Sequence, residues 1–281
     1  MKILITGAGG QLGQSIEKIS PLYNHEFVFT DLEQLDITDE NAVDLFLKAG
    51  KFDFLINTAA YTDVEKAEND YDNAFAVNAT APYLLAKYSK KYRTRFIHIS
   101  TDYVFDGKSC TPYTPKHATN PKNVYGITKL QGEKKILRCN KDAKIIRTSW
   151  LYSEFGNNFV KTILKLGQMK SSLNVVFDQV GTPTYATDLA RAVLKMTEHM
   201  PIESVFHFSD EGVCSWYDFA KKIVEIKGFK CKVLPVLSKE FPTIAQRPYY
   251  SVLDKSDIKL NLRIEIPHWE DSLRQCLEIL Q

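Results

Sequence analysis

The sequence predicts an α/β fold in which helices cover both faces of a parallel β-sheet, with a smaller α/β part at the C-terminus. Three observations support this prediction. Over the first half of the 281-residue chain, short apolar runs alternate with helix-period segments, the runs are apolar on both faces, and a glycine-rich turn follows the first run. Strict alternation of strand and helix is typical of a doubly wound sheet, whose ligand crevice opens at the carboxyl ends of the strands.

The apolar runs of the first half are rich in Ile, Val and Phe, as strands buried on both faces are. Amphipathic segments of helical period separate them. The expected strands are 2–6, 26–30, 52–57, 95–100 and 143–150, and the expected helices are 11–19, 40–49, 74–92 and 124–137.

A glycine-rich turn, TGAGGQLG, connects the first expected strand to the first expected helix, with Gly7, Gly10 and Gly13 spaced three residues apart. Glycine permits a positive φ and lets the backbone approach a pyrophosphate, which the helix N-terminus then attracts. A purely structural turn would also explain the spacing. The strand–turn–helix context at the start of the alternation favours dinucleotide binding.

The second expected strand ends at Asp31. This position is close to the roughly 20 residues after the glycine turn at which a carboxylate accepts hydrogen bonds from the adenosine ribose. A capping aspartate is the alternative interpretation. Because the 2′-phosphate of NADPH would meet the negative charge of Asp31, and no arginine follows directly, we expect NADH to be preferred to NADPH.

The second half of the chain alternates less regularly, and no repeat, low-complexity stretch or linker separates domains. Helices are expected at 158–166, 187–198, 216–226 and 269–280, and strands at 173–177, 205–209 and 232–236. Residues 1–150 are therefore expected to form a dinucleotide-binding Rossmann-like domain. Residues 151–281 are expected to form mainly a substrate-binding cap, with later segments crossing back into the first domain.

The composition is that of an ordinary globular protein, with 44% hydrophobic residues, 25% charged residues and a net charge of +2. The densest basic run, KYSKKYRTR at 87–95, is expected at the solvated end of a helix. No apolar run is long enough to span a bilayer, and five scattered cysteines without a C-x-x-C pair favour a reducing compartment. We therefore expect a cytoplasmic protein that binds neither nucleic acid nor membrane.

Candidate catalytic residues follow the fourth expected strand and open the helix after it. STDYVFDG places Thr101 and Asp102 where the crevice opens, and NVYGITK places Tyr125 and Lys129 one turn apart on a helix face. A nearby ammonium group is expected to lower the pKa of the tyrosine, which would make the phenol a better proton donor to a carbonyl that receives a hydride. An exposed tyrosine with a solvated lysine is the alternative for the helix in isolation.

A series of motifs along nearly the whole chain resembles the extended short-chain dehydrogenase/reductase superfamily, and most closely the dTDP-4-dehydrorhamnose reductase family. The motifs are TGAGGQLG, NTAAYTDVEKAE, VNATAP, ISTDYVFDG, NVYGITK, IIRTSWLY, GNNFVKT, DQVGTPT and RPYYSVLD. The resemblance implies reduction of the C4 keto group of dTDP-4-dehydro-L-rhamnose to dTDP-L-rhamnose, a nucleotide sugar for cell-surface polysaccharide such as lipopolysaccharide. NAD(P)H would supply the hydride.

The resemblance also implies roles for individual residues. Tyr125 would be the proton donor of a catalytic triad, and Lys129 would also hold the nicotinamide ribose. The triad is Thr101, Tyr125 and Lys129; the cofactor-binding positions are Gly7, Gly10, Gln11, Leu12, Gly13, Asp31, Asp36, Ile37, Ala60, Tyr61, Thr62, Tyr125 and Lys129; and the substrate-binding positions are Thr101, Asp102, Trp150 and Arg247. A core aromatic residue is the alternative for Trp150, and a surface ion pair is the alternative for Arg247.

One position departs from some relatives, which dimerise through a magnesium ion held in part by an acidic residue on the first helix. Here Ser15 occupies that position, so we expect no metal requirement and either a monomer or a homodimer. Two other functions remain open: another nucleotide-sugar 4-ketoreductase or epimerase, and a non-catalytic regulatory subunit like that of methionine adenosyltransferase. A dehydratase is disfavoured because Tyr103 follows Asp102 where dehydratases carry a second carboxylate.

Overall fold

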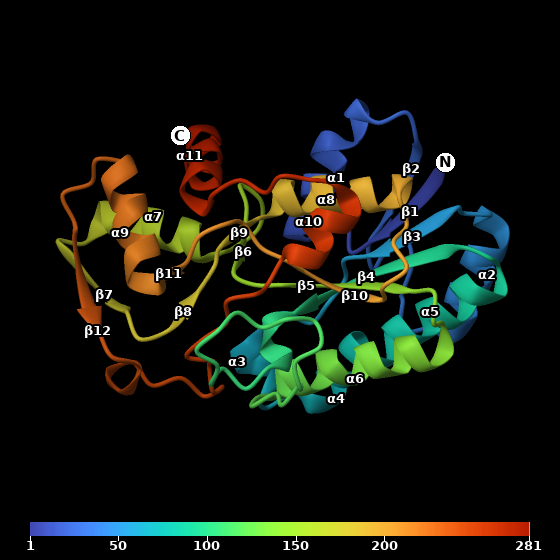
Figure 1. Cartoon of the computed structure of the whole chain (residues 1–281), viewed down its shortest axis with the longest axis horizontal. Coiled ribbons are helices and arrows are strands. Elements are labelled where there is room, and N and C mark those ends of the chain that lie inside the picture. The colour runs from blue at the N-terminus through green and yellow to red at the C-terminus, as the bar shows by residue number, and fades with distance from the viewer. Residues whose placement is uncertain (281) are drawn as a thin grey trace.

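Six parallel strands form the central sheet of the computed structural model, which describes residues 1–280. They lie in the order β10-β5-β4-β3-β1-β2, so the sixth strand comes from the second half of the chain (Figure 1). The bounds are β1 Lys2–Thr6, β2 Glu26–Thr30, β3 Phe54–Asn57, β4 Arg95–Thr101, β5 Lys144–Thr148 and β10 Val205–Phe208. The predicted parallel sheet of a Rossmann-like fold is confirmed.

Helices cover both faces of this sheet (Figure 1). The side chains of β1 show why its apolar run is continuous: Ile3 and Ile5 pack into the core under α1 and α8, and Leu4 packs into the core under α2 and α5. The helices around the sheet are α1 Gln11–Ile19, α2 Glu40–Gly50, α3 Val64–Ala67, α4 Tyr71–Phe75, α5 Ala81–Lys91, α6 Val124–Cys139, α8 Ala186–Glu198 and α10 Ser256–Leu262.

A smaller lobe lies beside the sheet and has its own core, which includes Tyr152, Phe219 and Leu273 (Figure 1). Its three two-stranded pairings are β6 with β9, β7 with β12, and β8 with β11. The bounds are β6 Leu151–Tyr152, β7 Ser172–Val176, β8 Val180–Gly181, β9 Thr184–Tyr185, β11 Cys214–Ser215, β12 Lys232–Val236, α7 Phe159–Met169, α9 Trp216–Ile226 and α11 Trp269–Ile279.

The single helix expected over 74–92 is instead divided into α4, a π-helical turn at Ala76–Thr80, and α5. Wide π turns often mark functional sites, because they reorient a side chain within a helix. Here Asn78 accepts a hydrogen bond from Tyr61 N at 2.9 Å and donates to Tyr61 O at 3.1 Å. It also donates to Thr128 Oγ1 of α6 at 3.2 Å. The turn therefore fixes the loop after β3 against α6.

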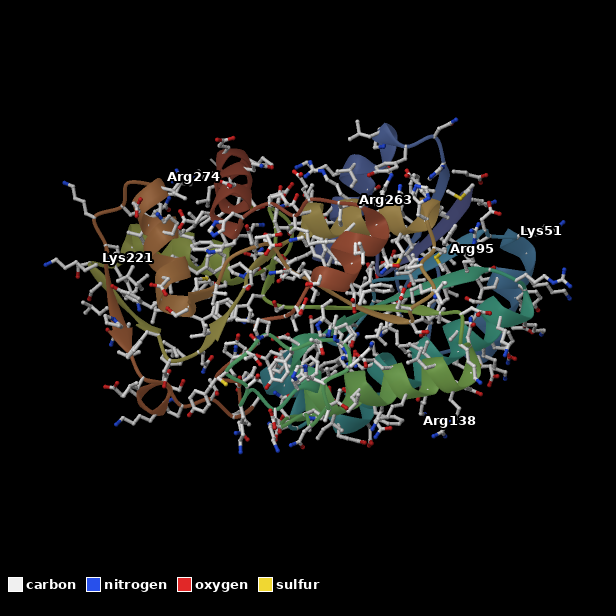
Figure 2. All side chains as sticks on the ribbon, viewed as in Figure 1. Lys51, Arg95, Arg138, Lys221, Arg263 and Arg274 are labelled. Atoms are coloured by element: carbon white, nitrogen blue, oxygen red, sulfur yellow. The ribbon has the colours of Figure 1, made fainter. Side chains whose placement is uncertain are left out.

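Positively charged side chains are spread over the outside of the molecule. Figure 2 shows Lys51, Arg95 and Arg138 around the sheet, and Lys221 and Arg274 on the smaller lobe. Within residues 1–280, none of the helices combines the length and the apolar character that crossing a bilayer requires.

Candidate active site

A cavity of about 710 Å³ opens at the carboxyl edge of the central sheet, where the ends of β1, β3, β4 and β5 meet the first turns of α6. Many of the positions implied by the resemblance meet there, although they are far apart in the sequence. Those that line the cavity are Gly7, Gly10, Gln11, Leu12, Asp31, Asp36, Ile37, Ala60, Thr62, Thr101, Asp102, Tyr125, Lys129 and Trp150.

The glycine turn has the geometry that a close-lying phosphate needs. Gly7 has a φ of 74°, and a Cβ atom there would lie 2.5 Å from the Ala59 nitrogen. Gly10 supplies no side-chain cap to α1, so the first N–H groups of this helix are left for an anionic ligand. Gly13 has a different structural role, because it does not line the cavity. A Cβ atom at Gly13 would lie 2.5 Å from the Gly7 carbonyl oxygen, so this glycine lets α1 pack against the turn.

Asp31 stands at the end of β2 with its carboxylate beside the glycine turn. Its Oδ2 accepts from Gly9 N at 3.0 Å, and its Oδ1 accepts from Leu32 N at 2.9 Å. The side chain is exposed at the rim of the cavity, and each oxygen has a further lone pair for a hydroxyl donor. This arrangement is compatible with an adenosine ribose at Asp31.

Two residues from the resemblance form side-chain hydrogen bonds to other parts of the protein. Tyr61 does not line the large cavity: its hydroxyl donates to Asp70 Oδ2 at 2.9 Å. Gln11 lines the cavity, but its Oε1 accepts from Ser153 Oγ at 3.0 Å and from Asn158 Nδ2 at 2.9 Å. The Gln11 side chain therefore ties the start of α1 to the smaller lobe.

Thr101 and Asp102 form a buried pair at the end of β4. Thr101 Oγ1 donates to Asp102 Oδ1 at 3.0 Å and accepts from Tyr103 N at 3.2 Å. Burial raises the pKa of Asp102 to about 7. Among the described residues, no hydrogen-bond partner reaches its buried Oδ2. Near neutral pH this carboxyl group can therefore either donate a hydrogen bond to a ligand hydroxyl or accept one from it.

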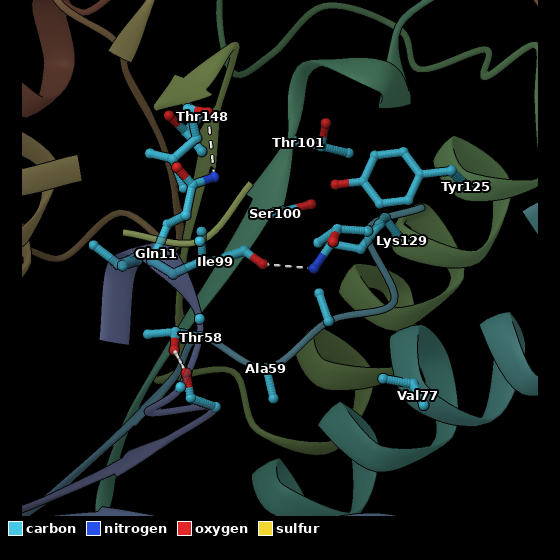
Figure 3. Close-up of a pocket in the computed structure, with 18 of the residues that line it drawn as sticks. Gln11, Thr58, Ala59, Val77, Ile99, Ser100, Thr101, Tyr125, Lys129 and Thr148 are labelled. Carbon is cyan, nitrogen blue, oxygen red and sulfur yellow. Dashed lines mark hydrogen bonds between the residues drawn. The ribbon is translucent and has the colours of Figure 1, made fainter. Parts of the chain in front are cut away.

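Tyr125 and Lys129 point from α6 into the same part of the cavity (Figure 3). The Tyr125 ring lies edge-on to the Tyr103 ring, with 5.5 Å between the centroids. Lys129 is buried, and its Nζ donates to the Ile99 carbonyl oxygen at 2.6 Å. The helical spacing that suggested this pair therefore brings both groups to one cavity.

The expectation that Lys129 lowers the pKa of Tyr125 is wrong in this structure. Burial, with a smaller contribution from Asp102, raises the pKa of Tyr125 to about 12. Burial also lowers the pKa of Lys129 to about 8. As the pH rises, the lysine loses its proton well before the phenol would ionise, so no cation stands beside Tyr125 in the alkaline range where a phenolate would form.

A second cavity of about 380 Å³ adjoins the first, and Trp150 lines both. The Trp150 ring stacks on Trp216 with centroids 3.5 Å apart and planes 7° from parallel. Arg247 lines this second cavity and not the first, and its Nη2 donates to Glu65 Oε1 at 2.9 Å. An aromatic surface and a cation therefore stand next to the candidate catalytic groups.

Glu65 holds the segment that carries Arg247. Its Oε2 accepts from Ile244 N at 2.8 Å and from Ala245 N at 3.2 Å, in addition to the ion pair with Arg247. Sequence reasoning missed Glu65, because nothing in NTAAYTDVEKAE indicates a partner almost 180 residues away.

Sequence reasoning also missed the polar side chains behind Lys129, which are Asn57, His98, Glu133 and Arg147. The one available signal was a histidine within the apolar run RFIHIS. No group of three or more His, Cys, Asp or Glu side chains within residues 1–280 could hold a metal ion. The absence of a metal requirement remains a prediction.

Comparison with known proteins decides the family of this chain. Residues 1–281 match the model of the family described as RmlD substrate binding domain. The chain belongs to this family. A spore coat polysaccharide biosynthesis protein, SpsK of Bacillus subtilis (strain 168), is 40% identical over 277 residues, which cover 99% of this chain and 97% of that protein.

Solved structures give the same result at the level of the fold. A dTDP-4-dehydrorhamnose reductase from Clostridium acetobutylicum superposes with a TM-score of 0.97 at 45% identity over 100% of both chains. A dTDP-4-dehydrorhamnose reductase from Bacillus anthracis, solved in complex with NADP, superposes with a TM-score of 0.95 at 36% identity over 99% of both chains. The resemblance identified from the sequence motifs is confirmed.

We predict that Glu65→Ala loosens the segment around Ile244. The substitution removes three hydrogen bonds to a carboxylate, one of them the ion pair with Arg247. Because Glu65 is about one-third exposed, the loss should amount to roughly 1.4 kcal/mol, or a tenfold increase in local opening. Thermolysin should cleave before the exposed Ile244 roughly ten times faster, as measured by mass spectrometry.

Glu68→Ala is the matched control, since Glu68 accepts from Val124 N and not from residues 244–247. Equal cleavage rates in the two variants would show that Glu65 does not restrain the segment.

Proposed function

We propose that this chain is an NAD(P)H-dependent reductase that converts dTDP-4-dehydro-L-rhamnose to dTDP-L-rhamnose. The observation that supports it best is a single cavity with an uncapped helix N-terminus at one end and a phenol, an amine and a strand-end hydroxyl at the other. The two solved reductases that superpose on the whole chain support the same reaction.

The chain offers groups for each part of a nicotinamide cofactor, which supplies the hydride when it is bound. The glycine turn and the N-terminus of α1 would hold the pyrophosphate, and Asp31 would hold the adenosine ribose. Lys129 would hold the nicotinamide ribose. Asp36, Ile37, Ala60 and Thr62 also line the cavity. Asp36 and Ile37 would lie on the adenosine side, and Ala60 and Thr62 would contact the cofactor from the turn after β3.

Tyr125 donates the proton that turns the C4 oxygen into a hydroxyl. Its high pKa keeps the phenol protonated at neutral pH. Proton transfer remains favourable because the alkoxide that forms on hydride addition is a stronger base than a phenolate. The hydroxyl hydrogen of Thr101, which points to Asp102 Oδ1 in the ligand-free chain, would turn to the same oxygen and orient the keto group toward Tyr125.

The remaining candidate residues bind the nucleotide sugar. The unpartnered Oδ2 of Asp102 bonds a sugar hydroxyl, and Trp150 lies between the two cavities. Arg247 binds the diphosphate, since its buried Nε has no partner among the described residues. In this proposal residues 151–281 serve mainly as a cap over the substrate.

A direct assay distinguishes this function from the two alternatives. Purified protein mixed with NADH and the 4-keto sugar nucleotide should oxidise the cofactor, with loss of absorbance at the reduced nicotinamide band and formation of dTDP-L-rhamnose. A different deoxyhexose as product would identify another 4-ketoreductase or an epimerase. Cofactor binding without turnover would instead favour a regulatory subunit.

Tyr125→Phe should fold and bind cofactor normally, while kcat falls by at least roughly 100-fold, the loss typical of a missing general acid. The phenylalanine keeps the edge-on contact with Tyr103, so the fold should change little. Stopped-flow measurement of cofactor oxidation gives kcat, and fluorescence titration gives cofactor affinity. A variant that retains near-normal kcat would remove Tyr125 from the role of proton donor.

We further propose that NADH is preferred to NADPH, by roughly tenfold or more in kcat/KM. The carboxylate of Asp31 at the rim of the cavity would repel a 2′-phosphate, although solvent and salt screen part of this repulsion. Steady-state kinetics with both cofactors test the preference. Asp31→Asn should reduce the ratio of kcat/KM with NADH to kcat/KM with NADPH. Equal or better kcat/KM with NADPH in the unmodified chain would contradict it.

A further inference from the structure

A row of polar side chains crosses the central sheet behind the candidate active site. Thr6, Asn57 and His98 stand opposite one another in the register of β1, β3 and β4, and all three are fully buried. Thr6 Oγ1 donates to Asn57 Oδ1 at 2.8 Å, and Asn57 Nδ2 lies 3.0 Å from His98 Nδ1. The row ends at Lys129, whose Nζ lies 3.4 Å from His98 Nε2.

The backbone of Ala59 fixes the direction of the hydrogen bonds in this row. Ala59 N approaches Asn57 Oδ1 at 3.1 Å, and a backbone N–H group can only donate, so this end of the amide is its oxygen. The NH₂ end of Asn57 therefore donates to His98 Nδ1. Burial is the main cause that lowers the pKa of His98 well below its usual value, so its ring is neutral and carries one hydrogen. That hydrogen is on Nε2, the atom that faces Lys129.

A hydrogen on His98 Nε2 suits a neutral amine better than an ammonium group. The amine nitrogen of Lys129 can accept from Nε2–H while it donates to the Ile99 carbonyl oxygen at 2.6 Å. An ammonium group has no lone pair, so two hydrogens of like partial charge would meet at this contact.

We propose that His98 is a positioning residue that holds the Lys129 side chain in the cavity and favours its neutral form. Through this contact Lys129 would exchange its proton near neutral pH, beside the phenol that gives up a proton in each turnover. The inference rests on the role proposed above for Lys129. It adds the residue that controls the protonation state of the Lys129 amine.

Other groups also act on this amine. Burial is the largest influence and lowers the pKa of Lys129 to about 8, while the negative charge of Glu133 raises it. Arg147 donates two hydrogen bonds to Glu133, at 2.9 and 2.6 Å, which offsets much of that charge. The titratable side chains around Lys129 are Tyr125 and Glu133 on α6, His98 on β4 and Asp102 after β4. Arg147 on β5 acts on Lys129 indirectly, through its hydrogen bonds to Glu133.

The tautomer of His98 can be measured directly in the cofactor-free protein. We expect two-dimensional ¹⁵N NMR of the histidine rings to show the hydrogen of His98 on Nε2. A hydrogen on Nδ1 would overturn the proposal, because Nε2 would then accept from an ammonium group. This measurement needs no variant and no turnover.

His98→Gln tests the effect on Lys129. A glutamine can turn its carbonyl oxygen toward Nζ, so the pKa of Lys129 should rise by about one unit. His207→Gln is the matched control, because His207 is also buried in the sheet with a pKa lowered to about 3, yet its Nδ1 faces the Tyr113 carbonyl oxygen. Its substitution should leave the titration of Lys129 unchanged.

The readout is NMR titration of the labelled lysine side chains in cofactor-free protein, with circular dichroism to confirm folding. An unchanged midpoint in His98→Gln, or an equal shift in His207→Gln, would overturn the proposal. Because the NMR experiments need no substrate, a failed reductase assay would contradict the proposed function and not this assignment.

Discussion

The register of the parallel sheet is the constraint on which the site depends. Thr6 of β1 stands opposite Asn57 of β3, and Asn57 stands opposite His98 of β4. This register brings the ends of the three strands to one edge, where the glycine turn, the loop after β3 and the Thr101–Asp102 pair follow. A shift of one residue in any strand would turn these side chains to the opposite face of the sheet. The same hydrogen-bonded ladder therefore sets both the shape of the cavity and the polar row behind it.

Helix α6 must approach this edge closely, and two glycines within it make that possible. A Cβ atom at Gly126 would lie 2.3 Å from the Tyr103 carbonyl oxygen, and one at Gly132 would lie 2.2 Å from the Asn78 carbonyl oxygen. Each glycine costs about 1 kcal/mol of helix propensity relative to alanine. The cost is offset by a position in which Tyr125 and Lys129 reach the cavity.

The close approach of α6 also buries charged side chains, and hydrogen bonds to Glu133 of this helix offset the cost of burying its charge. Glu133 lies one turn beyond Lys129 and binds Arg147 of β5 through two hydrogen bonds, while Ser100 of β4 donates to the same carboxylate. A buried carboxylate without such partners would cost several kcal/mol. With them, α6 is joined to β4 and β5 by directional contacts, so the positions of Tyr125 and Lys129 do not rely on apolar packing alone.

The sequence predicted those features that local pattern determines. The bounds of β1 and β2 and the turn between β1 and α1 follow from apolar runs and glycine spacing, and the helical spacing of Tyr125 and Lys129 placed both at one cavity. The π turn at 76–80 was missed because the apolar pattern of this segment is continuous and gives no sign of an interruption. Pro82 and the contacts of Asn78 mark the interruption in the structure. The two-residue strands of the lobe are too short for any period to be visible.

Long-range contacts explain the remaining differences between sequence and structure. The sign of the Tyr125 pKa shift depends on how deeply the phenol is buried, and the pairing of Arg247 depends on a glutamate from the other half of the chain. Contacts between the sheet domain and the smaller lobe also involve Gln11. This residue lines the candidate cofactor cavity and accepts hydrogen bonds from Ser153 and Asn158 of the lobe. A ligand that contacts Gln11 in this cavity would therefore touch a side chain that is already hydrogen-bonded to the lobe.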